Sequence, residues 1–567
     1  MDHAPTRALA VLSRLAVALL IPGLAAGLLG AAASPGRADT PAPGPQWITK
    51  SDSGVLYWED GSEVRLWGVN YFVPFSGEYA NLKRLRADIN SVIDRDLDDI
   101  QALEGNLVRV MVFDREITDP EGNLRDNPHL NALDYLVAAC RERGMYVYIT
   151  PISWVESDGD STNGFSDHWY RDELVRLREA WPPQENYLRR LAGHVNPHTG
   201  LAYAADPVIA VWDILCDPQA TGMTKNIIPL DQSAAYARRM MTVLREGGVR
   251  NPVVYSAYGL RFDKPEYSVV FEQSGVDGWS FELPVGGTAA RVHTSNYLSS
   301  RVWQAWLLRH PIEWVWGETF CPTFSAYSFA GELKSYMYPP LARSLVASGV
   351  QVAALYQYDS LPLAAHNAAF RLVWFNREFT PAAGMGFRMG ARLFRETPLG
   401  KPVPEGLPED NWNVDGMRAS QWLDVATLEE DGEFLFTNAP PFELEGTLED
   451  YRLLAGADST NLLGFTGQRW FTSSFDAADG RLDLELGPKA RLLESNPFET
   501  GKLSLNIRFC KKVAELDLEP SWVQLRLTDT TVAVYRENAG DWEPVPAEGL
   551  RFDAVPGRYR VYLDESR

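Results

Sequence analysis

The fold prediction rests on two apolar runs, Pro311-Ile-Glu-Trp-Val-Trp-Gly-Glu318-Thr-Phe320 and Asp206-Pro-Val-Ile-Ala-Val-Trp-Asp-Ile-Leu-Cys216-Asp217-Pro218. An acid lies at the end of each run, Glu318 in the first and Asp217 in the second. Each run has the length of a buried strand. Buried strands of a parallel barrel read as continuous hydrophobic runs, and active-site residues follow their C-terminal ends. We therefore expect Glu318 and Asp217 to face each other across a cleft, as acid/base glycoside chemistry requires.

Strand-like and helix-like segments alternate on both sides of these two runs. Counting them gives eight strands, most of them separated by a segment with helical periodicity. This rhythm is typical of a parallel α/β fold and predicts a (β/α)8 TIM barrel over residues 39–397. The expected strands are 66–72, 107–113, 145–150, 206–217, 253–258, 278–281, 311–318 and 351–359, and the expected helices are 93–103, 129–143, 185–194, 233–246, 297–309, 336–347 and 382–395.

The texture of the sequence changes after residue 397. Residues 398–410 hold four prolines, so we expect a linker there, with few contacts to the rest of the chain. From 411 to 567, short alternating segments are separated by turn residues. This pattern predicts a C-terminal all-β sandwich, an accessory domain of unassigned role.

Length and charge narrow the classes of function. A chain of 567 residues is too long for one ordinary core, so two domains are expected. The net charge of −22 disfavours nucleic acid and anionic membrane surfaces as partners and suits a neutral polymer. The 18 tryptophans fit a protein that stacks sugar rings, and packing in the core is the alternative for any single one of them.

The N-terminus has the pattern of a secretory signal over residues 1–38. Arg7 and Arg14 precede an apolar run from 15 to 33, and Ala31-x-Ala33 offers a cleavage site. We therefore expect a secreted or periplasmic protein, with an uncleaved anchor as the alternative because the run is close to spanning length. No later segment has the pattern of a transmembrane helix, and the sequence does not predict the oligomeric state.

The four cysteines are too few and too scattered for a disulfide scaffold. Cys140 lies on an apolar helical face and is expected in the core. Cys216 and Cys321 each lie beside one of the two acids, so a bridge between them stays open. His194 and His198 have a ligand-like spacing without a second pair, and we expect neither a metal nor a cofactor.

Beyond these patterns, residues 50–395 resemble the clan A retaining glycoside hydrolases, specifically the family 5 group of cellulases and β-mannanases. The segment that leads from Asn196 to Asp206 is especially similar to mannanases. The matching pieces are Leu66-Trp-Gly-Val-Asn70, Arg109 within Leu-Val-Arg-Val, Val195-Asn-Pro-His-Thr-Gly200, Asp206-Pro-Val-Ile-Ala-Val-Trp-Asp213, Trp316-Gly-Glu318 and Tyr356-Gln-Tyr358.

The resemblance implies roles for single residues. Glu318 takes the place of the nucleophile, Arg109 orients it, and Tyr356 forms the floor of a sugar subsite. Asp217 takes the place of the acid/base. Asn70 lies at the cleft end of its strand and is expected to contact the substrate or the nucleophile. Trp154, on the long loop after residue 150, is expected in the cleft wall.

The chain departs from the family at the acid/base motif, where Cys216-Asp217-Pro218 replaces Asn-Glu-Pro. A thiol is a weak donor and does not replace the amide that normally binds the sugar 2-hydroxyl. Asp is one methylene shorter than Glu, which withdraws the carboxyl by roughly 1.5 Å. Glu282, after the sixth strand, is a candidate substitute acid at a position where the usual His-x-Tyr is missing.

Two functions follow from these observations. The first is an exported O-glycosyl hydrolase acting on a neutral β-linked polysaccharide or oligosaccharide, by retention or inversion, and the balance of residues favours it. The second is a weakened or inactive barrel that serves as a carbohydrate-binding or cell-envelope protein. The fold does not distinguish them, because function depends on the site.

Overall fold

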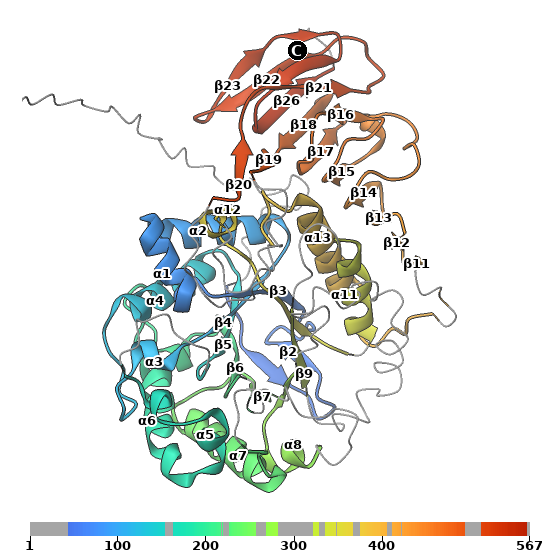
Figure 1. The fold of residues 1–567 in the computed structure, drawn as a ribbon. Helices are drawn as coiled ribbons and strands as arrows, with labels where there is room; N and C mark the ends of the chain where they lie inside the picture. Colours follow the sequence, from blue (N-terminus) through green and yellow to red (C-terminus); the bar gives the residue numbers. More distant parts are fainter. Residues whose placement is uncertain are drawn as a thin grey trace, which may run out of the picture.

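The computed structural model describes residues 44–153, 163–216, 218, 226–256, 268–281, 321–327, 335–347, 349–366, 375–404, 407, 411–420, 422–493 and 512–563. Within 321–327, and at a few other positions including Tyr356, only the backbone is described. A helix-covered barrel forms the N-terminal part and a group of sheets the C-terminal part (Figure 1).

Eight parallel strands form the barrel. Each strand pairs with the next along the chain, and the last strand also pairs with the first, so the sheet closes on itself. The strands are β3 (Leu66–Tyr71), β4 (Leu107–Met111), β5 (Tyr146–Thr150), β6 (Ile209–Asp213), β7 (Val253–Ser256), β8 (Gly278–Phe281), β9 (Cys321–Tyr327) and β10 (Val352–Tyr356).

Helices connect the strands and cover the outside of the barrel (Figure 1). They are α1 (Ser76–Leu85), α2 (Ile89–Ala102), α3 (Asp114–Ile117), α4 (Pro128–Glu142), α5 (Arg171–Arg176), α6 (Trp181–Gly193), α7 (Leu230–Glu246), α8 (Ser268–Ser274), α11 (Tyr338–Ala347), α12 (Leu361–Ala365) and α13 (Pro381–Glu396). The predicted parallel α/β architecture is thus confirmed. The helix expected at 297–309 lies outside the described residues, so the complete eightfold alternation stays a prediction.

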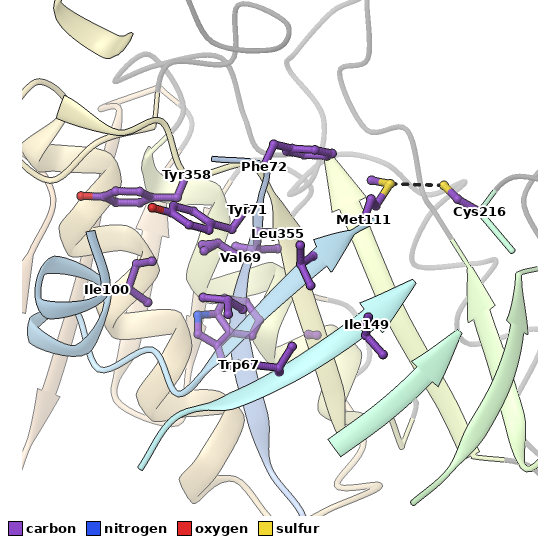
Figure 2. Packing of buried hydrophobic residues seen from close by; sticks show 14 of the residues in the cluster. Trp67, Val69, Tyr71, Phe72, Ile100, Met111, Ile149, Cys216, Leu355 and Tyr358 are labelled. Carbon is purple, nitrogen blue, oxygen red and sulfur yellow. Dashed lines mark hydrogen bonds between the residues drawn. The ribbon is translucent and has the colours of Figure 1, made fainter. Parts of the chain in front are cut away.

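Successive side chains of β3 point alternately to two apolar cores, one between the sheet and the helices and one inside the barrel. Trp67, Val69 and Tyr71 belong to the outer core under the helices (Figure 2). In this core the centre of the Trp67 ring lies 5.3 Å from that of Phe394 in α13. Successive strand residues point to opposite faces, so Leu66 and Asn70 point into the barrel. The inner apolar cluster is completed at one end by Ile48 and Leu56 of the hairpin β1 (Ile48–Lys50) and β2 (Leu56–Trp58).

Local signals explain where the helices begin. The Asn127 side chain accepts hydrogen bonds from the backbone N–H groups of His129 and Leu130, and Pro128 occupies the first turn of α4. Asp88 caps α2 in the same way through the N–H of Ser91. Such caps satisfy backbone donors that have no partner inside the helix, and a proline loses nothing there.

The prediction for the seventh strand was wrong in its limits. The strand that pairs with β8 and β10 is Cys321–Tyr327, whereas the apolar run chosen from the sequence ends at Glu318 and lies outside the described residues. The register joins Cys321 to Gly278 and Thr323 to Val352. Both stretches are apolar, and hydrophobicity alone does not decide which of two consecutive runs pairs with its neighbours.

The C-terminal part is built of sheets, as predicted. A ten-stranded sheet runs in the order β11-β12-β13-β14-β15-β17-β18-β26-β22-β23, and a four-stranded sheet in the order β16-β21-β25-β24. Phenylalanines and aliphatic residues from both sheets form one shared core. The strands are β11 (Asn411–Val414), β12 (Met417–Ser420), β13 (Val425–Glu430), β14 (Glu433–Phe436), β15 (Leu453–Gly456), β16 (Leu463–Phe465), β17 (Phe471–Asp476), β18 (Arg481–Leu486), β21 (Ser521–Leu525), β22 (Ala533–Asn538), β23 (Asp541–Val545), β24 (Ala547–Glu548), β25 (Arg551–Ala554) and β26 (Gly557–Tyr562), with β19 (Lys489–Leu492) and β20 (Ala514–Asp517) as a separate pair.

The described part of the expected linker 398–410, residues 398–404 and 407, makes more contacts than the sequence suggested. The buried guanidinium of Arg343 donates to the carbonyls of Lys401 and Pro402 and pairs with Asp415 of the C-terminal part. Val403 is buried in the same core as the barrel helices. Helix α13 ends before Pro398, as expected. The residues that follow pack against α11.

The structure also bears on membrane spans. Within the described ranges, every helix is too short or too polar to cross a bilayer.

Candidate functional site

A buried polar layer lies inside the barrel, toward the C-terminal ends of its strands. Arg109 of β4 is at its centre, with 1% of its surface exposed. Its Nη1 donates to Oδ1 of Asn70 over 3.0 Å, and its Nη2 donates to Oδ2 of Asp213 over 3.1 Å. The Asn70 amide in turn donates to the carbonyl of Ala354 in β10. The layer therefore ties together strands β3, β4, β6 and β10.

Asp213, the last residue of β6, gathers further donors in this layer. The hydroxyl of Tyr148 donates to its Oδ2 over 3.2 Å, and the hydroxyl of Thr150 lies 3.4 Å away. The Arg109 guanidinium lies 5.1 Å from the centre of the Tyr148 ring, an additional favourable contact for the cation. Both charges are fully buried, and a buried ion pair is kept by the hydrogen bonds around it.

Burial controls the titration of Asp213. It raises the pKa of the carboxyl from 3.8 to about 6, although Arg109 and the hydroxyl donors favour the charged form. The layer thus contains an acid whose charge changes close to the pH at which many enzymes work, next to a permanent cation.

Cys216 lies at the C-terminal end of the barrel, in the same region as this layer. Its backbone N–H donates to the carbonyl of Ile152 after β5, and its Sγ lies 3.4 Å from the sulfur of Met111, the last residue of β4 (Figure 2). The side chain is buried. Cys216 therefore contacts a thioether, a partner that suits a weak thiol donor.

The three acids expected from the sequence, Asp217, Glu282 and Glu318, lie outside the described residues, and so does Trp154. Tyr356 is the last residue of β10, and only its backbone is described. The meeting of Asp217 with Glu318 and the possible bridge from Cys216 to Cys321 therefore stay predictions.

Asn70 and Arg109 are described, and both lie in this polar layer, while their expected contacts with the substrate or the nucleophile stay predictions. The side chain of Asn70 is fully buried and has partners on both sides, so its described role is to hold Arg109 and β10 in place. Among the described residues, the carboxylate partner of Arg109 is Asp213, from a strand that does not neighbour β4. The expected orientation of Glu318 by Arg109 stays a prediction, because Glu318 lies outside the described residues.

Asp213 is the member of the site that reasoning from the sequence missed. A signal was present, because Asp213 is the one side chain within the apolar stretch 207–216 that is normally charged at neutral pH. A buried charge needs a partner inside the fold, and Arg109 within Leu-Val-Arg-Val is the same anomaly in another strand. Pairing the two anomalies would have predicted the contact.

A second buried acid follows β4 directly. Burial raises the pKa of Asp114 from 3.8 to about 7, and hydrogen bonding by Ser166 opposes this rise. Nearby, Glu116 accepts a hydrogen bond from the backbone N–H of Ser76. Asp114 is thus a group that can exchange a proton near neutrality, at the end of the barrel where active sites form.

Metal ligation finds no support where side chains are described, because those residues contain no group of three His, Cys, Asp or Glu side chains placed to hold an ion. His194 is engaged with the carboxylate of Asp134, at 2.9 Å, and His198 lies against the ring of Tyr135.

Comparisons with known proteins come from solved structures alone. No family model matches the chain, and no curated protein matches it. Similar solved structures include a glycoside hydrolase family 5 mannosidase from Rhizomucor miehei (13% identity, 62% of this chain and 98% of that chain, TM-score 0.48). Two others are the endo-β-1,4-mannanase from Thermotoga petrophila (14% identity, 88% and 98%, TM-score 0.46) and an exo-β-1,4-mannosidase from an Opitutaceae bacterium (18% identity, 61% and 62%, TM-score 0.45).

Proposed function

We propose that this chain is a glycoside hydrolase that acts on a neutral β-linked polysaccharide or oligosaccharide. The observation that carries the proposal is the buried layer of Asn70, Arg109 and Asp213 at the C-terminal end of a closed parallel barrel. Enzymes of this architecture place their active sites at that end of the barrel. Apolar side chains alone could fill the barrel interior, so packing does not explain why charged residues are buried there.

In the proposed reaction, Asp217 and Glu318 are the acid/base and the nucleophile. Asp217 is the next residue after Cys216, whose backbone is anchored at the C-terminal end of β6. It would protonate the leaving oxygen while Glu318 attacks the anomeric carbon. Carboxyls about 5–5.5 Å apart give retention, and about 6.5–9.5 Å with a water between them gives inversion. The short Asp217 side chain favours the longer separation.

The test is a hydrolysis screen on neutral polysaccharides and aryl glycosides with the wild type, Glu318→Gln and Asp217→Asn. We expect turnover to fall by about 10³-fold or more in Glu318→Gln while binding of the glycan is kept. NMR of the first-formed anomer distinguishes retention from inversion. Asp541→Asn, an exposed acid on β23, is the matched control. Equal turnover in Glu318→Gln and the wild type would reject Glu318 as the nucleophile.

A second function is favoured by the limits of β9. This strand begins at Cys321, after Glu318 in the chain, whereas a nucleophile is expected at the C-terminal end of its strand. A barrel that binds a glycan without cleaving it would tolerate this shift and the replacement of Asn-Glu by Cys216-Asp217. In the same screen, binding by the wild type with no turnover on any substrate would establish this second function.

We also propose that the chain is exported and loses residues 1–38. The support is the basic, apolar and small-residue pattern of this segment. The mass of the protein recovered outside the cytoplasm, compared with that of the full chain, tests the proposal. A mature protein that still contains Met1 would instead support the uncleaved anchor.

A further inference from the structure

A hollow lies on the surface of the C-terminal part, between two loops. Its volume is about 420 Å³, within the range of small-molecule sites, and two loops line it. The first loop follows β14 and provides Phe442 and Glu443 after two prolines. The second follows β15 and provides Ser459, Thr460 and Asn461.

The two loops are fixed to each other. The amide of Asn461 donates to the carbonyl of Leu444 over 2.8 Å, and its oxygen accepts from the N–H of Leu444 over 2.9 Å. The Thr460 hydroxyl oxygen accepts from the N–H groups of Leu462 and Leu463. A site whose walls are already held in place loses little conformational entropy on binding.

Phe442 presents an aromatic surface that the fold does not cover. Its side chain is 41% exposed, while its ring meets Phe434 edge-on at 6.4 Å and the guanidinium of Arg418 lies 5.9 Å from its centre. Residues that pack against one side of a ring hold the remaining surface in a constant orientation. An exposed, positioned aromatic is the kind of surface on which an apolar ligand face packs.

The polar part of the lining indicates the chemistry of the ligand. Among the residues that the structure describes, none binds the carboxylate of Glu443 or the hydroxyl of Ser459, so both are available to a ligand. The lining contains one acid and no base. Acceptors and hydroxyl groups beside an aromatic surface suit a ligand with many hydroxyls and an apolar C–H face, and the acid disfavours an anion.

We propose that this hollow binds a sugar ring of a neutral glycan, with the pyranose packed on Phe442 and its hydroxyls bound by Glu443 and Ser459. The site is on the C-terminal part and is separate from the barrel layer, so the proposal does not depend on cleavage by the barrel. The C-terminal part, for which the sequence predicts no role, would then bind a glycan.

Hydrogen–deuterium exchange of the full chain with mannohexaose or cellohexaose tests the proposal directly. We expect slower exchange in the peptides that contain residues 440–443 and 459–461 when either sugar binds there. Calorimetry should show binding at least tenfold weaker in Phe442→Ala and weaker in Glu443→Gln. Phe442→Tyr should keep the affinity, because it keeps the ring.

Leu518→Ala, which truncates an exposed apolar side chain elsewhere on the C-terminal part, is the matched control. Equal thermal stability of Phe442→Ala and the wild type would show that the fold is intact. Protection confined to barrel peptides, an unchanged Kd in Phe442→Ala, or no binding of either sugar would overturn the proposal. Equal affinity for hexagalacturonate would overturn its restriction to neutral glycans.

Discussion

At the scale of single residues, the decisive contact is that between Arg109 and Asp213. The guanidinium and the carboxylate are both buried inside the barrel, where they form an ion pair. Asn70 accepts a further hydrogen bond from Arg109, and Tyr148 and Thr150 donate to Asp213. Removing two charges from water is costly, so such a pair is weak evidence that the contact stabilises the fold. The raised pKa of Asp213 shows that burial outweighs the attraction of Arg109.

The first prediction concerns Asp213→Asn. Because the folded-state pKa is about 6 and the ordinary value is 3.8, the folded protein holds this proton longer than the unfolded chain. The stability of the wild type therefore falls as pH rises from about 4 through 6, whereas neutral Asn does not titrate. The free energy of unfolding of the variant, relative to wild type, should rise by on the order of 3 kcal/mol over this window.

Urea unfolding of both proteins from about pH 4 to 8 measures this difference. Asp541→Asn, the exposed acid on β23, controls for the loss of one carboxylate at the surface. A difference between Asp213→Asn and wild type that stays constant with pH would contradict the assigned pKa.

At the scale of elements, one carboxylate binds three arginines of α13, the helix whose apolar side chains pack against the barrel. Glu104 follows α2 and accepts hydrogen bonds from Arg388, Arg392 and Arg395 of α13 at 2.6–2.9 Å. Arg392 also pairs with Glu433 of β14. Glu104 therefore binds all three arginines of this helix face, and the pair of Arg392 with Glu433 links the same face to the C-terminal sheet.

Replacing Glu104 by Gln tests this arrangement. Burial alone would raise the pKa of Glu104, but Arg388, Arg392 and Arg395 together lower it from 4.5 to about 2. A lowered pKa contributes stability above pH 4.5 that is lost as pH falls toward 2. Glu104→Gln should therefore lower the free energy of unfolding by on the order of 3 kcal/mol at neutral pH, and by less as the pH falls below about 4.

Denaturant titrations at neutral pH and at about pH 3.5 provide the comparison. Glu121→Gln, an exposed acid on the loop before α4, is the control and should change little at either pH. A variant as stable as wild type at neutral pH would show that the three arginines do not need Glu104.

At the scale of the whole molecule, the barrel and the first strands of the C-terminal sheet share one core. Trp412, Val414 and Met417 pack in the same cluster as the barrel helices. The indole of Trp470 in addition donates to Glu378 over 2.9 Å, and the guanidinium of Arg377 lies 3.7 Å from the centre of its ring. An interface that is this apolar and this well paired does not behave as a flexible junction between domains.

We therefore expect the full chain to unfold in a single calorimetric transition, and a chain that ends at residue 404 to be unstable or aggregated. Trp470→Ala should shift the whole transition to lower temperature, by an amount equivalent to about 3–5 kcal/mol. Trp470→Phe keeps most of the apolar contact and should have a smaller effect. Two separate transitions, with only one of them moved by Trp470→Ala, would refute the shared core.

What the sequence determined by itself is the local periodicity of the chain. Buried strands such as 107–111 and capped helices such as 128–142 are encoded in neighbouring residues, so the parallel α/β part and the sheet-rich C-terminal part could be predicted. Asn70 and Arg109 were singled out from the sequence as polar residues within buried strands, and the structure places both in the polar layer.

The tertiary structure alone decided which distant segments meet. Asp213 pairs with Arg109 across an intervening strand, β9 begins after Glu318, and the proline segment packs against Arg343. Pairing partners and register depend on contacts between residues far apart in the chain. The hydrophobic periodicity within a segment does not indicate which distant segment it contacts. Periodicity shows that a stretch is buried, but only the assembled fold shows against what.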